Sequence, residues 1–145
     1  DVNVIVCGDD RVGRLTKLFQ SDKFKDRFFL LENQEQHQID NIYDALDVLF
    51  FTSSEESSPN VLIEAMANKV PIVSTNIMAT RELITTGVNG VLLEQNNARN
   101  MVMEITALLD KRAVRATLAE NAFKRYKTDF CIKDVKQILE QAFAI

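Results

Sequence analysis

The sequence predicts an α/β protein with an open, doubly wound parallel sheet, and three observations support this fold class. Short apolar segments alternate with amphipathic segments over the first 93 residues. Most of the short segments are apolar throughout, which is typical of parallel strands that are buried on both faces. After residue 93 only helical periodicity remains. The pattern therefore indicates βαβ units that are followed by a helical C-terminal cap.

The expected strands are rich in Val, Ile, Leu and Phe, and they cover residues 2–7, 27–31, 48–52, 71–75 and 90–93. Amphipathic segments between them predict helices over residues 12–21, 36–46, 59–68 and 80–85. Three more helices are expected without intervening strands, over residues 98–109, 112–126 and 133–143. We interpret residues 1–145 as one Rossmann-like domain.

Composition and charge narrow the classes of function. The chain has 145 residues, of which 46% are hydrophobic and 26% are charged, as in an ordinary soluble globular domain. A net charge of −4 argues against nucleic acid as the main partner. The two cysteines, Cys7 and Cys131, are expected to be reduced, buried thiols, and the single histidine leaves no pattern of a metal site. No apolar segment reaches the length of a membrane span.

The start of the expected helix at residue 59 has the composition of an anion-binding site. The strand before it ends in "SSEESSP", in which Ser58 is a suitable N-cap and Pro59 suits the first helical position. The backbone N–H groups of residues 60–62 would then be free and would point out of the helix end, where the helix dipole favours phosphate. In an open α/β sheet this helix end lies at the carboxyl edge of the strands, where ligands bind.

Two glutamates flank this helix start, eight positions apart. Glu64 lies roughly 7 Å along the helix from the N-terminus. A diphosphate on the helix end would place its ribose near Glu64, whose carboxylate can accept hydrogen bonds from both ribose hydroxyls. Glu56 lies on the other side of the phosphates, where a sugar on the distal phosphate would sit. The spacing therefore suits a nucleotide-sugar, and the alternative is that both glutamates are solvated surface residues.

The segment "S-x-x-E-S-S-P-N-V-L-I-E-A-M-A-x-x-x-P-I-V-S-T" resembles the E-x7-E region of glycosyltransferase family 4, whose members are retaining enzymes of the GT-B fold. The likeness continues through "VNVIVCGDD", "DNIYDALDVLFFTSSEE" and "RELITTGVNGVLL", and it covers most of residues 2–93. It implies the donor-binding C-terminal half of a two-domain enzyme. Such an enzyme transfers a hexose or N-acetylhexosamine from a nucleotide diphosphate sugar, here expected to be a UDP-sugar, to a glycan or lipid-linked acceptor.

The resemblance also implies roles for individual residues. Glu56 matches the catalytic glutamate at the donor sugar, and Glu64 matches the glutamate that binds the ribose. The base would lie, by a looser match, near Glu32, Asn33 and Gln34. The donor sugar and diphosphate would be bound by Gly8, Ser57, Ser58, Pro59, Asn60, Val61 and Leu62. No metal and no cofactor are implied, because the nucleotide-sugar is a substrate and, in the family, helix N–H groups and basic side chains neutralise its diphosphate.

Three departures from the family pattern limit what the resemblance implies. Ser57 replaces a glycine, and residues 77–79 replace a glycine pair, which leaves substrate specificity open. The family's first strand, with its diphosphate-binding Arg and Lys, has no counterpart in this sequence. Either the strand at residues 2–7 pairs directly with the strand at 48–52, or exposed sheet edges favour an oligomer.

The absent N-terminal half would hold the acceptor, so the fragment alone is expected to lack transfer activity. The parent protein is expected to be cytoplasmic, and the resemblance is compatible with peripheral association at the cytoplasmic face of the membrane.

Two other interpretations stay open. The chain could serve as a non-catalytic domain that binds nucleotide-sugars or acts as a scaffold. A receiver-like signalling domain would explain Asp9 and Asp10 after a strand. A receiver also needs an aspartate at the carboxyl end of its third strand, whereas Asp47 here precedes that strand.

Overall fold

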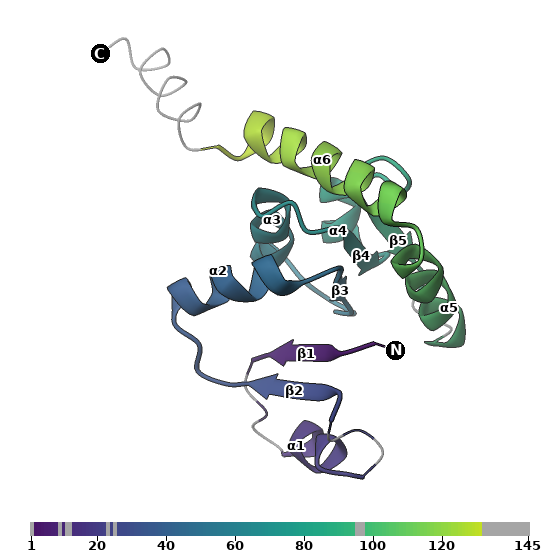
Figure 1. Ribbon diagram of the computed structural model, residues 1–145. Coiled ribbons are helices and arrows are strands. Elements are labelled where there is room, and N and C mark those ends of the chain that lie inside the picture. The colour runs from purple at the N-terminus through teal and green to yellow at the C-terminus, as the bar shows by residue number, and fades with distance from the viewer. Residues whose placement is uncertain are drawn as a thin grey trace. The chain divides into compact units, whose positions relative to one another are not determined.

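The computed structural model describes residues 2–8, 10, 13–22, 24, 26–94 and 98–131 (Figure 1). The chain divides into two compact units, Asp1–Ile42 and Tyr43–Ile145. The described strands are all parallel and form two sheets, one of two strands and one of three. Parallel strands with intervening helices confirm the predicted α/β class. The helix expected at residues 133–143 lies outside the described residues, and the prediction of one domain over residues 1–145 stays a prediction.

The first unit contains a two-stranded parallel sheet and a short helix. Strand β1 (Val4–Cys7) pairs with β2 (Phe28–Leu31), with Val4 opposite Phe28. Helix α1 (Arg14–Phe19) packs its buried terminal residue Phe19 on Phe28, with ring centroids 5.0 Å apart. Helix α2 (Gln36–Ala45) then leads along the chain into the second unit.

The second unit is built on the sheet of β3 (Leu49–Phe51), β4 (Ile72–Thr75) and β5 (Val91–Leu93), in the order β3-β4-β5. Every residue of β4 is buried; β4 is the central strand, and its Val73 packs against Leu108 and Leu118 of the helices. The prediction that most strands are buried on both faces is therefore wrong outside β4. Phe29 on β2 is 46% exposed and Phe50 on β3 is 39% exposed, and both strands lie at an edge of the described sheets.

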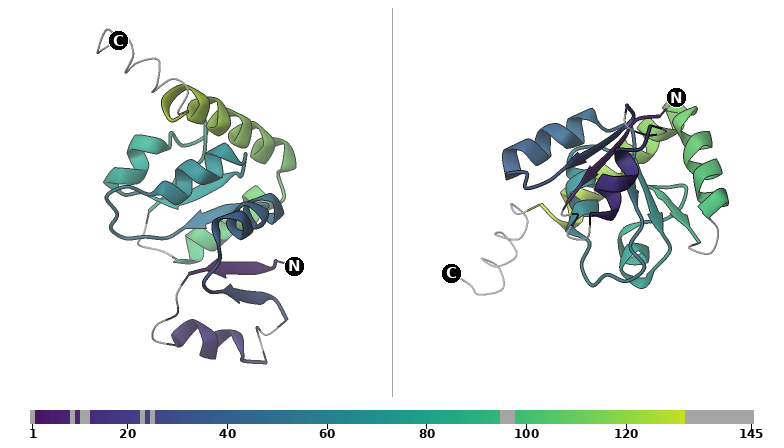
Figure 2. Two further views of the ribbon diagram at one scale, coloured as in Figure 1. Left: turned by 90° about the vertical axis from the view of Figure 1, so that its left-hand side faces the viewer. Right: turned by 90° about the horizontal axis from the view of Figure 1, so that it is seen from below.

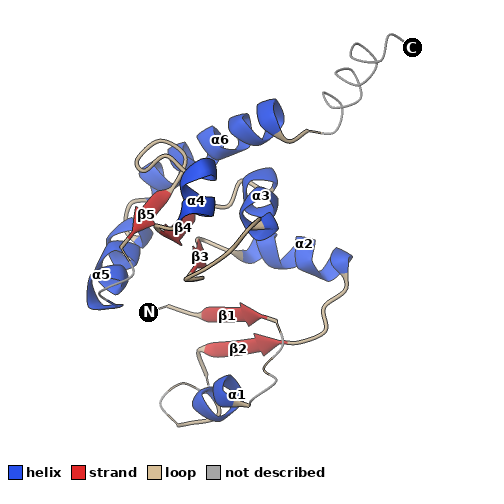
Figure 3. Cartoon of the chain, turned by 180° about the vertical axis from the view of Figure 1, so that it is seen from behind, coloured by secondary structure: helices blue, strands red, loops and turns tan. Residues whose placement is uncertain are grey.

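Four helices complete the second unit: α3 (Asn60–Ala67), α4 (Met78–Leu83), α5 (Ala98–Leu109) and α6 (Arg112–Asp129). Helix α6 lies across α3 and α4 (Figures 1 and 3). The start of α6 packs beside the end of α5 (Figure 2). The core between these helices and β4 is formed by Leu62, Ala65, Met66, Val73, Leu108, Leu118, Ala119 and Ala122.

The connection from α4 to β5 is fixed by a buried asparagine. Asn89 is 3% exposed, accepts a hydrogen bond of 2.7 Å from the N–H of Thr85, and donates one of 2.9 Å to the carbonyl of Leu83. Gly87 has a φ of 78°, a left-handed conformation that glycine adopts without strain. Both polar groups of the buried Asn89 side chain are therefore hydrogen-bonded within the connection that leads to β5.

Some predicted boundaries and environments differ from the structure. The helix expected at residues 80–85 is Met78–Leu83, because the hydroxyl of Thr80 accepts the N–H of Ile77 and starts the helix earlier. Cys7 is exposed and Cys131 is half-buried, so the predicted burial of both thiols is wrong; Cys7 ends an edge strand. The described strands form two separate sheets, one in each unit, and both expected arrangements of the strands stay predictions.

Candidate functional site

The candidate site lies on the loop between β3 and α3, at the carboxyl edge of the second sheet. The hydroxyl of Thr75, the last residue of β4, donates a hydrogen bond of 2.6 Å to the carbonyl of Ser53. This bond ties the beginning of the loop to the central strand. The loop then reaches α3 through Pro59, which is buried. Parallel strands thus place the loop where ligands of open α/β sheets bind.

The start of α3 differs by one residue from the prediction. Pro59 has φ −79° and ψ 77°, outside the helical region, and serves as the N-cap, so that Asn60 is the first helical residue. The N–H of Asn60 donates to the carbonyl of Ser58 at 2.9 Å, which makes an inverse γ-turn centred on Pro59. The prediction of Ser58 as the N-cap is wrong, because this turn keeps Pro59 out of the helix and the Ser58 side chain makes no capping bond.

The predicted set of free N–H groups is also wrong in part. The N–H of Asn60 is bonded to Ser58, and the N–H of Leu62 donates to the carbonyl of Pro59 at 2.9 Å. Only the N–H of Val61 has no acceptor among the residues that the structure describes. Two of the three predicted donors are thus already hydrogen-bonded within the turn. A ligand could accept from them only by replacing these bonds.

Glu56 provides an internal anion for the loop. Its side chain is exposed, and its Oε1 accepts hydrogen bonds from the N–H groups of Ser57 at 3.0 Å and Ser58 at 3.4 Å. Two consecutive N–H groups therefore converge on one carboxylate oxygen. Backbone donors that converge in this way form a small anion-binding concavity.

Glu64 lies on α3, one turn beyond this loop, and is half-buried. Its Oε2 accepts a hydrogen bond of 2.9 Å from the hydroxyl of Tyr43, a residue that is only 5% exposed. Tyr43 was not among the predicted site residues. The signal that could have identified it is a tyrosine on the buried face of the amphipathic helix α2, because a buried tyrosine hydroxyl usually has a hydrogen-bond partner.

The remaining predicted residues lie in the first unit, where β1 and β2 end. Gly8 has a φ of 144°, and its N–H donates to the carbonyl of Leu31 at 3.1 Å. Glu32 accepts the N–H of Asp10 at 3.2 Å, and Gln34 donates to the carbonyl of Glu32 at 2.8 Å. Asn33 is in the left-handed region, with a φ of 53°. The structure therefore brings residues 56–62 and Glu64 together in one unit and Gly8 and residues 32–34 in the other, and the roles of all of them stay predictions.

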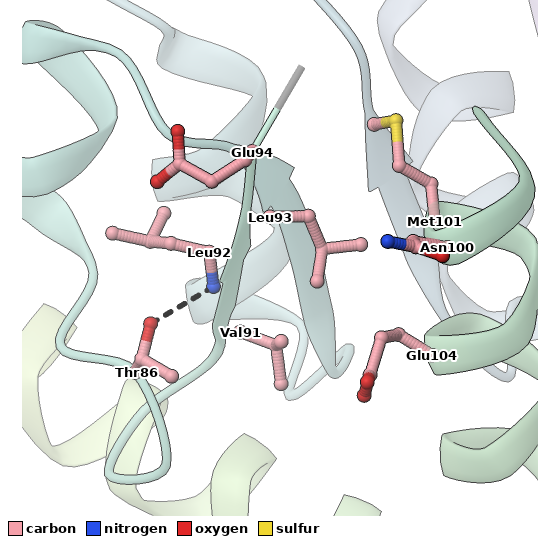
Figure 4. Close-up of a pocket in the computed structure, with 8 residues that line it drawn as sticks. All are labelled: Thr86, Val91, Leu92, Leu93, Glu94, Asn100, Met101 and Glu104. Atoms are coloured by element: carbon pink, nitrogen blue, oxygen red, sulfur yellow. Dashed lines mark hydrogen bonds between the residues drawn. The ribbon is translucent and has the colours of Figure 1, made fainter. Parts of the chain in front are cut away.

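A pocket of about 340 Å³ lies beside β5 (Figure 4). The side chains of Leu93 and Met101 face each other across it, and the hydroxyl of Thr86 accepts the N–H of Leu92 at 3.0 Å. Its lining consists of Thr86, Val91, Leu92, Leu93, Glu94, Asn100, Met101 and Glu104. None of the predicted site residues contributes to it, so this pocket does not define the candidate site.

Comparison with known proteins identifies the family. Residues 1–125 match the family model of glycosyl transferases group 1. The chain belongs to this family. An uncharacterized glycosyltransferase from Methanocaldococcus jannaschii is 24% identical over 144 residues, which cover 97% of this chain and 41% of that protein.

Solved structures with a similar fold include two complexes of Anabaena HepE. The crystal structure of Anabaena HepE in complex with UDP superposes with a TM-score of 0.85 at 25% identity, and covers 99% of this chain and 41% of HepE. HepE in complex with UDP-glucose gives a TM-score of 0.84 at the same identity. This glycosyltransferase chain thus has the Rossmann-like α/β fold of these neighbours, and it spans less than half the length of the relatives named here.

Three further observations concern a metal site, a membrane-spanning helix and the receiver interpretation. Within the described ranges, no group of three or more His, Cys, Asp or Glu residues is arranged to hold a metal ion. Nor does any described helix have the length and apolar composition needed to cross a bilayer. The carboxylate of Asp10 accepts the N–H groups of Arg14 and Thr16 at the start of α1. Asp10, one of the two aspartates behind the receiver interpretation, thus bonds the start of α1. The other, Asp9, lies outside the described residues.

Proposed function

We propose that this chain is the donor-binding half of a retaining, family 4-type glycosyltransferase. The reaction is transfer of a hexose or N-acetylhexosamine from a UDP-sugar to a glycan or lipid-linked acceptor. The observation that carries the proposal is the placement of Glu56 and Glu64 on either side of the start of α3, with convergent N–H groups between them. The UDP and UDP-glucose complexes of HepE support a nucleotide-sugar donor.

Each part of the site has a role in this proposal. The N–H groups of Ser57 and Ser58 exchange the Glu56 carboxylate for an oxygen of the diphosphate, and a charged acceptor makes such bonds strong. Glu64 accepts hydrogen bonds from the ribose hydroxyls. Glu56, released from the loop, contacts the donor sugar and stabilises the reacting centre electrostatically. N–H donors neutralise the diphosphate in this scheme, so it uses neither a metal nor a cofactor.

The rest of the proposal concerns the protein around this chain. The acceptor is held by a second domain of a longer protein, so these 145 residues alone bind the donor without transferring its sugar. The protein works in the cytoplasm, at the cytoplasmic face of the membrane when the acceptor is lipid-linked. Detectable sugar transfer by the isolated chain would contradict the proposal that the acceptor is bound by another domain.

The experiment that tests the proposal is a titration of the 15N-labelled chain with UDP, and separately with GDP, followed by backbone amide shifts. Shifts are expected at residues 56–62, at Glu64 and at residues 32–34, and they should be larger for UDP. Without a basic side chain on the diphosphate, we expect a dissociation constant near or above ~1 mM. A well-dispersed spectrum that does not respond to either nucleotide would contradict the proposal.

Matched variants separate the two glutamates. Glu64→Ala should weaken UDP binding, whereas Glu56→Gln should not weaken it, because the diphosphate replaces the Glu56 side chain at the N–H groups of Ser57 and Ser58. In a protein that joins this chain to an acceptor domain, Glu56→Gln should lower sugar transfer strongly. Glu55→Gln is the control, because Glu55 is the exposed neighbour of the same charge and is outside the proposed contacts. Equal transfer by the Glu55 and Glu56 variants would show that Glu56 has no special role.

A further inference from the structure

We infer that Tyr43 is a positioning residue that orients the carboxylate of Glu64 for a ribose diol; this inference rests on the proposed function. The hydroxyl of Tyr43 lies 2.9 Å from Oε2 of Glu64 and 3.3 Å from the carbonyl oxygen of Val61. A tyrosine hydroxyl has only one proton to donate. The shorter distance and the negative charge both direct that proton to Glu64.

The bond leaves acceptor sites of the carboxylate for a ligand. Oε2 of Glu64 accepts one hydrogen bond from the tyrosine, whereas Oε1 has no hydrogen-bond partner in the part of the chain that the structure describes. Glu64 is half-buried on α3. A carboxylate that is fixed through one oxygen presents the other in a defined direction, which suits two adjacent hydroxyls.

The environment of Tyr43 makes it a rigid support. The residue is 5% exposed, so its ring is held by packing and has little freedom to rotate. Glu64, by contrast, is a long side chain that would sample several rotamers without a partner, and ordering it would cost conformational entropy on binding. The tyrosine bond orders the carboxylate before the ligand binds, and this preorganisation favours affinity.

Binding of UDP and of 2′,3′-dideoxy-UDP tests this role, because the second ligand has no diol for Glu64 to hold. Tyr43→Phe keeps the ring and removes only the hydroxyl. We expect the variant to bind UDP about fivefold more weakly than the wild type and to bind 2′,3′-dideoxy-UDP equally well. In a Glu64→Ala background, Tyr43→Phe should change neither affinity. Amide-shift titrations of the 145-residue chain supply all four comparisons.

Tyr126→Phe is the matched control, because Tyr126 is the other tyrosine of the chain and its hydroxyl has no described partner. An equal loss of UDP and 2′,3′-dideoxy-UDP affinity in Tyr43→Phe would mean a purely structural role and would overturn the inference. Unchanged UDP affinity in that variant would overturn it as well, while leaving the proposed function standing. A wild-type chain that binds neither ligand would contradict both.

Discussion

Arg125 and Asn89 donate hydrogen bonds to the same acceptor, the carbonyl oxygen of Leu83 at the end of α4. Arg125 donates through Nη1 and Asn89 through Nδ2, each at 2.9 Å. Arg125 belongs to α6 and Asn89 to the turn before β5, so one carbonyl joins three segments of the second unit. A carbonyl oxygen has two lone pairs, so both bonds form together.

Removing both donors should cost more stability than the sum of the two single changes. Either single alanine substitution leaves the Leu83 carbonyl with one partner, whereas the double variant leaves it buried and unpaired. We expect losses of about 1 kcal/mol for Arg125→Ala and about 2 kcal/mol for Asn89→Ala, which also frees the N–H of Thr85. Urea unfolding of the four proteins measures the coupling. Lys124→Ala, an exposed change on the same helix, is the control, and strictly additive losses would contradict the shared acceptor.

Gly90 should not tolerate a methyl group. A Cβ at this buried position would lie 2.9 Å from Cγ2 of Ile84 and 3.1 Å from the carbonyl oxygen of Ile72. We expect Gly90→Ala to lower the free energy of unfolding by about 2 kcal/mol through overpacking. In an Ile84→Ala background the same change should cost less, because the nearest atom is gone. An equal loss of stability in both backgrounds would show that the Ile84 side chain is not the cause of the overpacking.

The packing of α3 on α6 depends on small side chains. Ala65 and Ala122 are both fully buried, one on each helix. Ala122→Leu should force the helices apart and cost about 2 kcal/mol of stability. Ala116→Leu on the exposed side of α6 is the matched control and should stay within about 0.5 kcal/mol of the wild type. Thermal unfolding of the two variants makes the comparison, which fails if both shift equally.

The start of α1 should lose its cap at low pH. Hydrogen bonds from Thr16, chiefly its backbone N–H, lower the pKa of Asp10 below its ordinary value of about 3.9. Because the pKa is lower in the folded state, the stabilisation by the carboxylate is complete above the unfolded value. It is lost as the pH falls through the folded value.

The amide shift of Thr16 should therefore titrate with an inflection below about 3.9, and Asp10→Asn should abolish this inflection. Asp26→Asn serves as a comparison, because Asp26 is an exposed aspartate of the same unit. A Thr16 inflection at or above the ordinary value would mean that the cap does not favour the charged carboxylate.

Local sequence patterns predicted the order of the elements well. Strands β3, β4 and β5 and helices α3 and α5 lie within a residue or two of their expected bounds, because periodicity and turn residues are local properties. The exposure of Phe29 and Phe50 was not predictable in the same way. It depends on which strands pair, and pairing joins segments that are distant in the sequence.

The candidate site was predictable to a similar extent. The helix start and both glutamates follow from the residues, but the γ-turn at Pro59 depends on a ψ angle that the sequence leaves open. The bond between Tyr43 and Glu64 spans 21 positions and requires Tyr43 to lie beside α3. Sequence patterns therefore located the loop before α3 and both glutamates, and they missed the tyrosine that is hydrogen-bonded to one of them.

Helix α3 has eight residues, and they carry two different kinds of constraint. Leu62, Ala65 and Met66 are fully buried, whereas Glu64 is only half-buried and retains an oxygen without a described partner. Random substitutions on the buried side should be removed by selection for folding, whatever ligand is supplied. Under the proposed function, substitutions of Glu64 should in addition be removed by selection for binding. A substitution library of this one short helix would thus separate positions that only the fold constrains from a position that ligand binding constrains as well.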